Sequence, residues 1–139
     1  MLRGNLLHPE ILAALAGAGH GATILVADAN YPFSTHSQVD AAVVYLNLAP
    51  GIVTVPQVVE RIAEACPLES AAINVPASGE ESEVGSIIRQ MLEPGIPVSA
   101  LGRFEFYEAV RTPDLCLVVA TGDTRIYSCA LLTIGFIAG

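Results

Sequence analysis

The chain has 139 residues, of which 53 % are apolar and only 14 % are charged, and its formal net charge is −8. Such a composition can bury a substantial core and excludes intrinsic disorder. The chain contains no lysine, and its six arginines are scattered, so no basic stripe is available to bind nucleic acid. The shortage of charge also indicates that part of the surface is covered by other subunits.

The ends and the cysteines bear on the cellular compartment. No basic segment with a long apolar run and a small-residue cleavage site opens the sequence, so we expect no signal peptide. No run of about 18 apolar residues lacks a charge or a helix breaker, so we expect no membrane span. Cys66, Cys116 and Cys129 are odd in number and widely spaced, which fits neither a disulfide framework nor a zinc ribbon. A reducing, cytoplasmic location is therefore predicted.

The first half of the chain alternates between helical and strand patterns. Pro9 begins a predicted helix that Gly17 and Gly19 end. Residues 23–27, Thr-Ile-Leu-Val-Ala, form a continuous β-rich run typical of a strand buried on both faces, and a turn-rich loop follows Asp28. The next predicted elements are a strand over 41–46, a helix capped by Thr54 and ended by Pro67, and a strand over 71–75.

The second half continues this alternation and then changes. Ser82 or a neighbour is predicted to cap a helix that ends at Pro94-Gly95. The strand over 96–101 contains Pro97 and is expected at a sheet edge, and a short helix covers 104–111. Two apolar strands, 115–120 and 126–134, are joined by Thr121-Gly122-Asp123-Thr124, which we predict to be a tight, hairpin-like turn.

This order of elements predicts the fold class. Strands alternate with helices through most of the chain, as in α/β proteins with a parallel sheet. A short turn between the last two strands adds an antiparallel pair. We therefore expect a single domain over residues 1–139, with three α/β/α layers, a largely parallel central sheet and an antiparallel edge.

Polar residues at the ends of strands are the candidates for a functional site, because ligands of open α/β sheets bind beyond the carboxyl ends of the strands. Asp28 ends the first strand, Arg103 follows the strand over 96–101, and Tyr127 opens the last strand. His20 lies in a Gly-His-Gly turn just before the first strand. The glycines of this turn follow a helix and precede a strand, which is the wrong order for a dinucleotide-binding fingerprint.

Two other chemistries are open to these residues. His20, Asp28 and His36 could bind a metal ion, although their spacing matches no known metal-binding pattern. Cys129 could pair with His20 as a nucleophile. No cysteine-protease signature or nucleophile elbow accompanies that cysteine, and a cysteine in an apolar strand is usually part of the core.

Three motifs, in matching order, resemble the fucose mutarotase/ribose pyranase family over nearly the whole chain. They are Gly19-His20-Gly21 with the strand and Asp28-Ala29-Asn30-Tyr31-Pro32 that follow it, Gly102-Arg103-Phe104-Glu105-Phe106-Tyr107-Glu108, and Thr121-Gly122-Asp123 followed by Tyr127. The chain resembles the fucose branch more closely, because the ribose branch usually carries histidine at the position of Arg103.

The resemblance implies a cofactor-independent monosaccharide mutarotase that needs no metal and interconverts the ring forms of L-fucose or a similar aldose by acid/base catalysis. It implies that His20 is the catalytic acid, and that family members form closed rings, typically decamers, in which this histidine faces the pocket of the neighbouring subunit. The residues that it implies for sugar binding are Asp28, Arg103, Tyr127, Ser128 and Cys129.

Two positions depart from the family pattern and keep other functions open. Cys129 stands where asparagine is usual, and Thr133 or Ile134 stands where a lysine is common. Because a sugar-binding amide is missing, a non-catalytic monosaccharide-binding protein associated with sugar transport is the alternative. A third hypothesis is a metal- or thiol-dependent hydrolase that uses His20, Asp28, His36 or Cys129.

Overall fold

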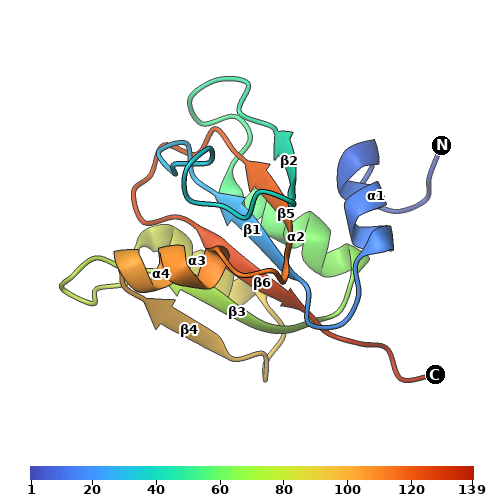
Figure 1. The fold of residues 1–139 in the computed structure, drawn as a ribbon. Helices are drawn as coiled ribbons and strands as arrows, with labels where there is room; N and C mark the ends of the chain where they lie inside the picture. The colour runs from blue at the N-terminus through green and yellow to red at the C-terminus, as the bar shows by residue number, and fades with distance from the viewer.

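The computed structural model describes all 139 residues and contains four helices and six strands (Figure 1). None of the helices combines the length and apolar character that crossing a membrane requires. In chain order the elements are α1 (Pro9–Gly17), β1 (Thr23–Ala27), β2 (Ala42–Tyr45), α2 (Val55–Ala65), β3 (Leu68–Asn74), α3 (Glu83–Met91), β4 (Val98–Leu101), α4 (Arg103–Val110), β5 (Leu115–Ala120) and β6 (Ala130–Ile134).

Local signals in the sequence account for several of these boundaries. Pro9 stands at the start of α1, and its fixed φ suits a first helical position. Thr54 precedes α2, and its backbone N–H donates to Gln57 Oε1 at 2.9 Å. Ser82 caps α3, where its Oγ accepts the N–H of Gly85 at 3.0 Å. The predictions of these three helix starts are confirmed.

The six strands form one sheet in the order β2-β5-β1-β6-β3-β4. β5 is parallel to β1 and β2, and β3 is parallel to β4, whereas β6 is antiparallel to both of its neighbours, β1 and β3. Five strands therefore run in one direction and β6 runs against them. The α/β class with a mixed, largely parallel sheet is confirmed, and β4 lies at an edge as Pro97 predicted.

The predicted hairpin between the last two strands is wrong, and so is the edge position of the antiparallel strand. β1 lies between β5 and β6, and β6 begins at Ala130 rather than at residue 126. The reason lies in the connection: the N–H and Oγ1 of Thr121 both donate to Ala27 O, at 3.0 and 2.8 Å. The chain therefore crosses the end of β1 before it enters the sheet on the other side.

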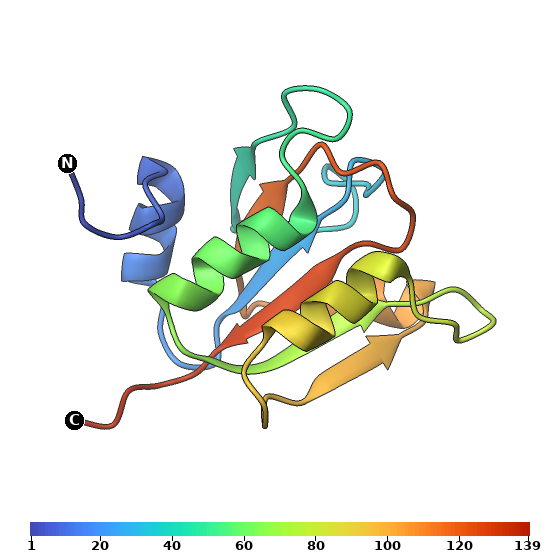
Figure 2. The same ribbon diagram turned by 180° about the vertical axis from the view of Figure 1, so that it is seen from behind.

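Helices cover both faces of the sheet, which confirms the three predicted layers (Figures 1 and 2). α2 and α3 lie side by side on one face, where Ile62 and Ile88 are fully buried in one core that also includes Ile11 of α1. α4 lies on the other face, and its Phe106 and Val110 belong to a second core with Leu25 of β1. The two cores hold the sheet, and with it the ends of its strands, in place.

Candidate functional site

A hollow of about 330 Å³ lies where the loops after β1, β3, β4 and β5 meet. This is the carboxyl edge of the five co-directional strands, where open α/β sheets bind ligands. Four of the six predicted site residues line it, namely Asp28, Arg103, Tyr127 and Cys129. Their roles in binding stay predictions. The other lining residues are Asn30, Tyr31, Asn74, Phe106, Tyr107 and Ile126.

Asp28 is the buried carboxylate of this hollow, with 4 % of its surface exposed. Its Oδ1 accepts the N–H of Asn30 at 2.9 Å, and its Oδ2 accepts the N–H of Ser128 at 3.3 Å. Burial raises the pKa of Asp28 above its ordinary value, and hydrogen bonds from Ser128, Cys129 and Asn30 act in the opposite direction. A carboxylate with several fixed donors keeps its orientation without a ligand, which suits it to accept hydrogen bonds from hydroxyl groups.

Cys129 and Ser128 support Asp28 from the loop before β6. The Cys129 thiol is buried and donates to Asp28 Oδ2 at 3.3 Å. Burial and the charge of Asp28 raise the pKa of this thiol well above its ordinary value, so it is a poor nucleophile. Ser128 does not line the hollow: its Oγ donates to Ile126 O at 3.3 Å, and only its backbone N–H reaches Asp28.

Asn74 is a polar residue of the hollow that the sequence reasoning missed. Asn74 is the last residue of β3, just as Asp28 directly follows β1. The rule that ligands bind beyond the carboxyl ends of the strands therefore points to Asn74 as well. Its Oδ1 accepts the N–H of Cys129 at 2.9 Å, which directs the amide into the hollow, and its Nδ2 makes no hydrogen bond within the chain. An amide donor is therefore present beside the position where Cys129 lacks one.

Arg103 and Tyr127 stand at the rim. Arg103 Nε donates to Tyr107 OH at 3.2 Å, and the guanidinium lies 5.4 Å from the centre of the Phe104 ring and 5.6 Å from that of the Tyr107 ring. Tyr127 adopts a left-handed backbone conformation with φ of 53°, and its carbonyl accepts the Ser82 hydroxyl at 2.6 Å. These contacts orient a cation and an aromatic ring around the opening.

His20 lies at the opposite end of the sheet, before β1, and is not brought together with the hollow of its own chain. Because a strand rises about 3.3 Å per residue, the five residues of β1 separate His20 from Asp28 by roughly 16 Å or more. His36 lies in the loop after β1, with its ring 4.5 Å from that of Tyr107. His20, Asp28 and His36 therefore cannot share a metal ion within one chain, and Cys129 cannot pair with His20 there.

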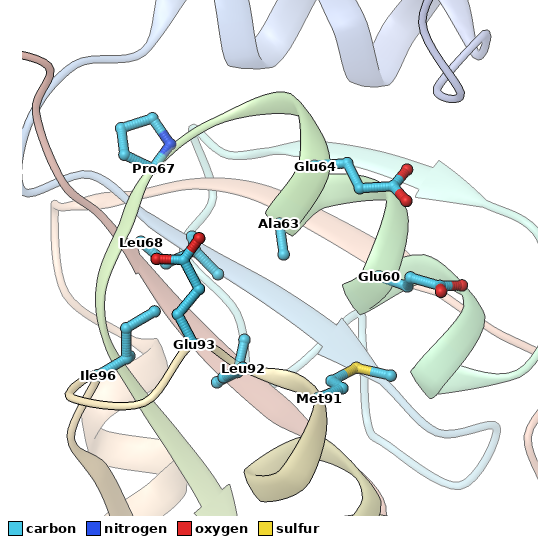
Figure 3. Close-up of a pocket in the computed structure, with 9 residues that line it drawn as sticks. All are labelled: Glu60, Ala63, Glu64, Pro67, Leu68, Met91, Leu92, Glu93 and Ile96. Atoms are coloured by element: carbon cyan, nitrogen blue, oxygen red, sulfur yellow. The ribbon is translucent and has the colours of Figure 1, made fainter.

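A second hollow, of about 550 Å³, lies between α2 and the C-terminal end of α3 (Figure 3). Its polar side chains are three glutamates, and two of them, Glu60 and Glu64, form ion pairs with Arg61. No amide, hydroxyl, imidazole or cationic side chain lines it, so ionised carboxylates are its only polar side chains and none of them donates a hydrogen bond. The smaller hollow at the carboxyl edge is the candidate site because four of the predicted site residues line it. The residues lining the larger one are Glu60, Ala63, Glu64, Pro67, Leu68, Met91, Leu92, Glu93 and Ile96.

Fold and site together define a small α/β protein with a ligand hollow at a sheet edge, furnished with a carboxylate, an amide, a guanidinium and tyrosines. Such groups suit a ligand rich in hydroxyls. Residues 1–137 match the model of the RbsD / FucU transport protein family. The chain belongs to this family.

Relatives of the chain bear two kinds of name. Human fucose mutarotase is 36 % identical over 96 % of this chain and 91 % of that protein. D-ribose pyranase of Cutibacterium acnes is 30 % identical, and the match covers 97 % of this chain and 98 % of that protein.

Solved structures are similar as well. The fucose mutarotase of Streptococcus pneumoniae in complex with L-fucose has a TM-score of 0.77 at 27 % identity, covering 94 % of each chain. Bacillus subtilis RbsD complexed with D-ribose has a TM-score of 0.84 at 21 % identity, covering 99 % of this chain and all of that one, and supports the fold alone.

Proposed function

We propose that this protein is a cofactor-independent monosaccharide mutarotase that exchanges the anomers of L-fucose or a similar aldose. The observation that carries the proposal is the hollow at the carboxyl edge, where buried Asp28, the free amide of Asn74 and the guanidinium of Arg103 face one space. Relatives named fucose mutarotase and D-ribose pyranase, matched over nearly their whole length, support the reaction class. The resemblance to the fucose branch at Arg103 favours L-fucose.

The chemistry requires proton transfers and the reversible opening of one carbon–oxygen bond, with no change of oxidation state. The bond between the anomeric carbon and the ring oxygen breaks, the ring oxygen gains a proton, and the anomeric hydroxyl loses one to become an aldehyde. Rotation about the adjacent carbon–carbon bond presents the other face of the carbonyl, and both transfers reverse on closure. An imidazole exchanges protons readily near neutral pH, so His20 is the group proposed for this work.

The substrate contacts follow from the groups in the hollow. Asp28 can accept hydrogen bonds from sugar hydroxyls, whereas Arg103 and Asn74 Nδ2 can donate them. Tyr127 can stack against the apolar face of the sugar ring or donate a hydrogen bond. Ser128 and Cys129 contribute indirectly, since their N–H and thiol hold the carboxylate of Asp28.

The position of His20 supports a site built from two subunits. More than half of its side chain (55 %) is exposed, at the end of the sheet remote from the hollow of the same chain. Large apolar side chains are exposed at both places: Phe136 beside His20, followed in sequence by Ile137, and Ile126 in the hollow, with Phe104 next to Arg103 at its rim. Pairing these surfaces between copies in a closed cytoplasmic ring, proposed as a decamer, would bring His20 to a neighbour's hollow.

Saturation-transfer NMR on a panel of aldoses that includes L-fucose and D-ribose tests the proposal. We expect the protein to accelerate anomer exchange, and His20→Ala to abolish the acceleration. His8→Asn is the matched control, because His8 caps α1 and asparagine caps helices well. If no aldose exchanges faster at neutral pH than in buffer, the proposal is wrong.

A non-catalytic monosaccharide-binding protein associated with sugar transport is the second candidate. The thiol of Cys129, where an amide is usual in the family, favours it. This function predicts that a sugar raises the melting temperature while anomer exchange stays at the rate in buffer. The same samples used for the exchange measurement therefore separate the two functions.

A further inference from the structure

His20 and Glu69 meet at the end of the sheet away from the hollow. Three segments run beside one another there: the turn before β1, the start of β3 and the chain after β6 (Figures 1 and 2). Backbone hydrogen bonds join them, from Gly21 N–H to Ile134 O at 2.9 Å and from Gly135 N–H to Pro67 O at 2.8 Å. Within this frame His20 Nε2 lies 2.6 Å from Glu69 Oε2.

An irregularity in the sheet sets the direction of Glu69. The register between β3 and β6 shifts between Leu68 and Ser70, so Glu69 is the residue left out of the regular pairing. Such bulges turn a side chain away from its regular alternation. A Cβ on Gly135 would lie 3.4 Å from the backbone nitrogen of Glu69, so the chain just after β6 lies close against this part of β3. The bulge and this close packing fix the backbone of Glu69, from which its carboxylate reaches the imidazole.

We propose that Glu69 is a positioning residue, which holds the proton of His20 on Nε2 and leaves Nδ1 to exchange protons with the sugar. An ionised carboxylate only accepts hydrogen bonds, so the Nε2 of a neutral ring must carry the hydrogen. Its lone pair then lies on Nδ1. When the ring is protonated, Nε2 keeps its hydrogen bond to Glu69 and Nδ1 carries the proton that can be transferred.

This assignment rests on the proposed role of His20, and it deepens that role by naming the reacting nitrogen. The second neighbour of the ring agrees with a fixed orientation: the Phe136 ring lies 5.2 Å from the imidazole at an interplanar angle of 64°. With an exposed imidazole, the Glu69 contact is the polar interaction that distinguishes one ring orientation from its flipped alternative. Glu69 acts through His20 and need not touch the substrate.

Nitrogen-15 NMR of histidine-labelled protein tests the assignment directly. The signals of His20 are identified by their loss in His20→Ala, and the spectra are recorded at alkaline pH, where imidazole rings are neutral. We expect the Nε2–H form in the wild-type protein and a mixture of both forms in Glu69→Ala. A wild-type ring protonated on Nδ1 would overturn the proposal.

Exchange kinetics supply the second readout. We expect Glu69→Ala to slow aldose exchange by about tenfold or more, because part of the gain from a positioned acid/base is lost. Glu69→Gln keeps an acceptor oxygen, so its exchange rate is expected to lie between those of the wild type and Glu69→Ala. Glu93→Gln removes the same charge from an exposed site and should leave the rate unchanged.

The outcomes separate this assignment from the proposed function. Glu69→Ala protein with the wild-type exchange rate and wild-type nitrogen shifts would show that Glu69 does not position His20. A wild-type protein without exchange activity would instead remove the mutarotase proposal. The nitrogen shifts need no substrate, so they decide the state of the His20 ring in either case.

Discussion

Cys129 and Asp28 contact each other twice in the interior of the protein. The thiol donates to Asp28 Oδ2 at 3.3 Å, and the N–H of Asp28 donates to Cys129 Sγ at 3.4 Å. Burial and the nearby carboxylate raise the pKa of the thiol well above its ordinary value. The thiol therefore keeps its proton at neutral pH and acts as a hydrogen-bond donor to the carboxylate of the hollow.

This relationship predicts resistance to alkylation. We expect the native protein to keep its aldose-exchange activity in iodoacetamide with Cys129 unmodified, because thiolate is the reactive form and this thiol is buried. Peptide mass spectrometry measures the modification, and urea-unfolded protein, in which all three free cysteines should react, is the control. Loss of activity in step with alkylation of Cys129 would instead favour thiol chemistry.

Ser82 connects the start of α3 to Tyr127, and the two roles of its hydroxyl can be separated. Ser82→Ala should lower the free energy of unfolding by about 1 kcal/mol, through the lost helix cap, and should also weaken sugar binding. Weaker binding follows because the Tyr127 carbonyl loses the donor that holds its left-handed backbone. Glycine caps helices almost as well as serine, so Ser82→Gly should recover most of the stability but not the affinity.

Urea unfolding and calorimetric sugar titration measure these two effects of the Ser82 variants. Equal sugar affinity in all three proteins would show that the Ser82 contact does not position Tyr127.

Gly122 lies where the loop after β5 crosses the segment before α2, and no side chain fits there. A Cβ at this position would lie 2.2 Å from Ile52 O and 2.4 Å from Ala49 O, both backbone atoms. We expect Gly122→Ala to lower the free energy of unfolding by about 3 kcal/mol, the upper part of the range for overpacking. Gly19→Ala is the control, because nothing lies within 4 Å of its added Cβ. Similar urea midpoints for the two variants would contradict this close packing.

Asp123 makes the stability depend on acid pH. Burial raises its pKa, but hydrogen bonds from Arg125 and from the N–H of Val55 outweigh burial and place the pKa below its ordinary value of 3.8. A lowered folded-state pKa contributes stability that is present above the unfolded value and is lost as the pH falls through the folded value. Asp123→Asn should therefore be less stable than wild type by about 1–3 kcal/mol at neutral pH.

The difference between wild type and Asp123→Asn should shrink as the pH falls below 3.8. The raised pKa of Asp28 acts in the opposite sense: burial, its main cause, is common to both proteins, and the charge of Asp123, which the substitution removes, is a lesser cause. Urea unfolding of both proteins across this pH range makes the measurement. A stability difference that stays constant with pH would contradict the assigned ion pair.

Phe136 tests whether the apolar surface beside His20 joins subunits. Its side chain is 67 % exposed in the chain, so Phe136→Asp should leave the protomer folded, as circular dichroism can check. We expect light scattering to show a smaller assembly than in the wild type, together with a loss of aldose exchange of about tenfold or more. Val39→Asp is the comparison, at a still more exposed position (91 %) in the loop between β1 and β2. If the wild type or Phe136→Asp were active as a monomer, that result would contradict a site shared between subunits.

Much of the local structure could be read from the sequence because its causes are local. The β-rich run at 23–27 and the apolar run at 115–120 became β1 and β5 with the predicted bounds, since strands buried on both faces read as runs with little polar alternation. Pro97, just before β4, correctly indicated an edge position, because proline has no N–H to donate to a neighbouring strand. Asp28, Arg103, Tyr127 and Cys129 could be found as candidates from the strand ends and the family motifs.

The tertiary structure alone decided how distant segments meet. β6 entered the sheet between β1 and β3, and β3 began at Leu68 instead of residue 71, because strand order depends on pairings between residues far apart in sequence. The same pairings bring Asn74 to the hollow and Glu69 to His20, contacts that no short motif records. Spacing along the chain determined which residues end strands, and the packing of the sheet decided which of those ends share a site.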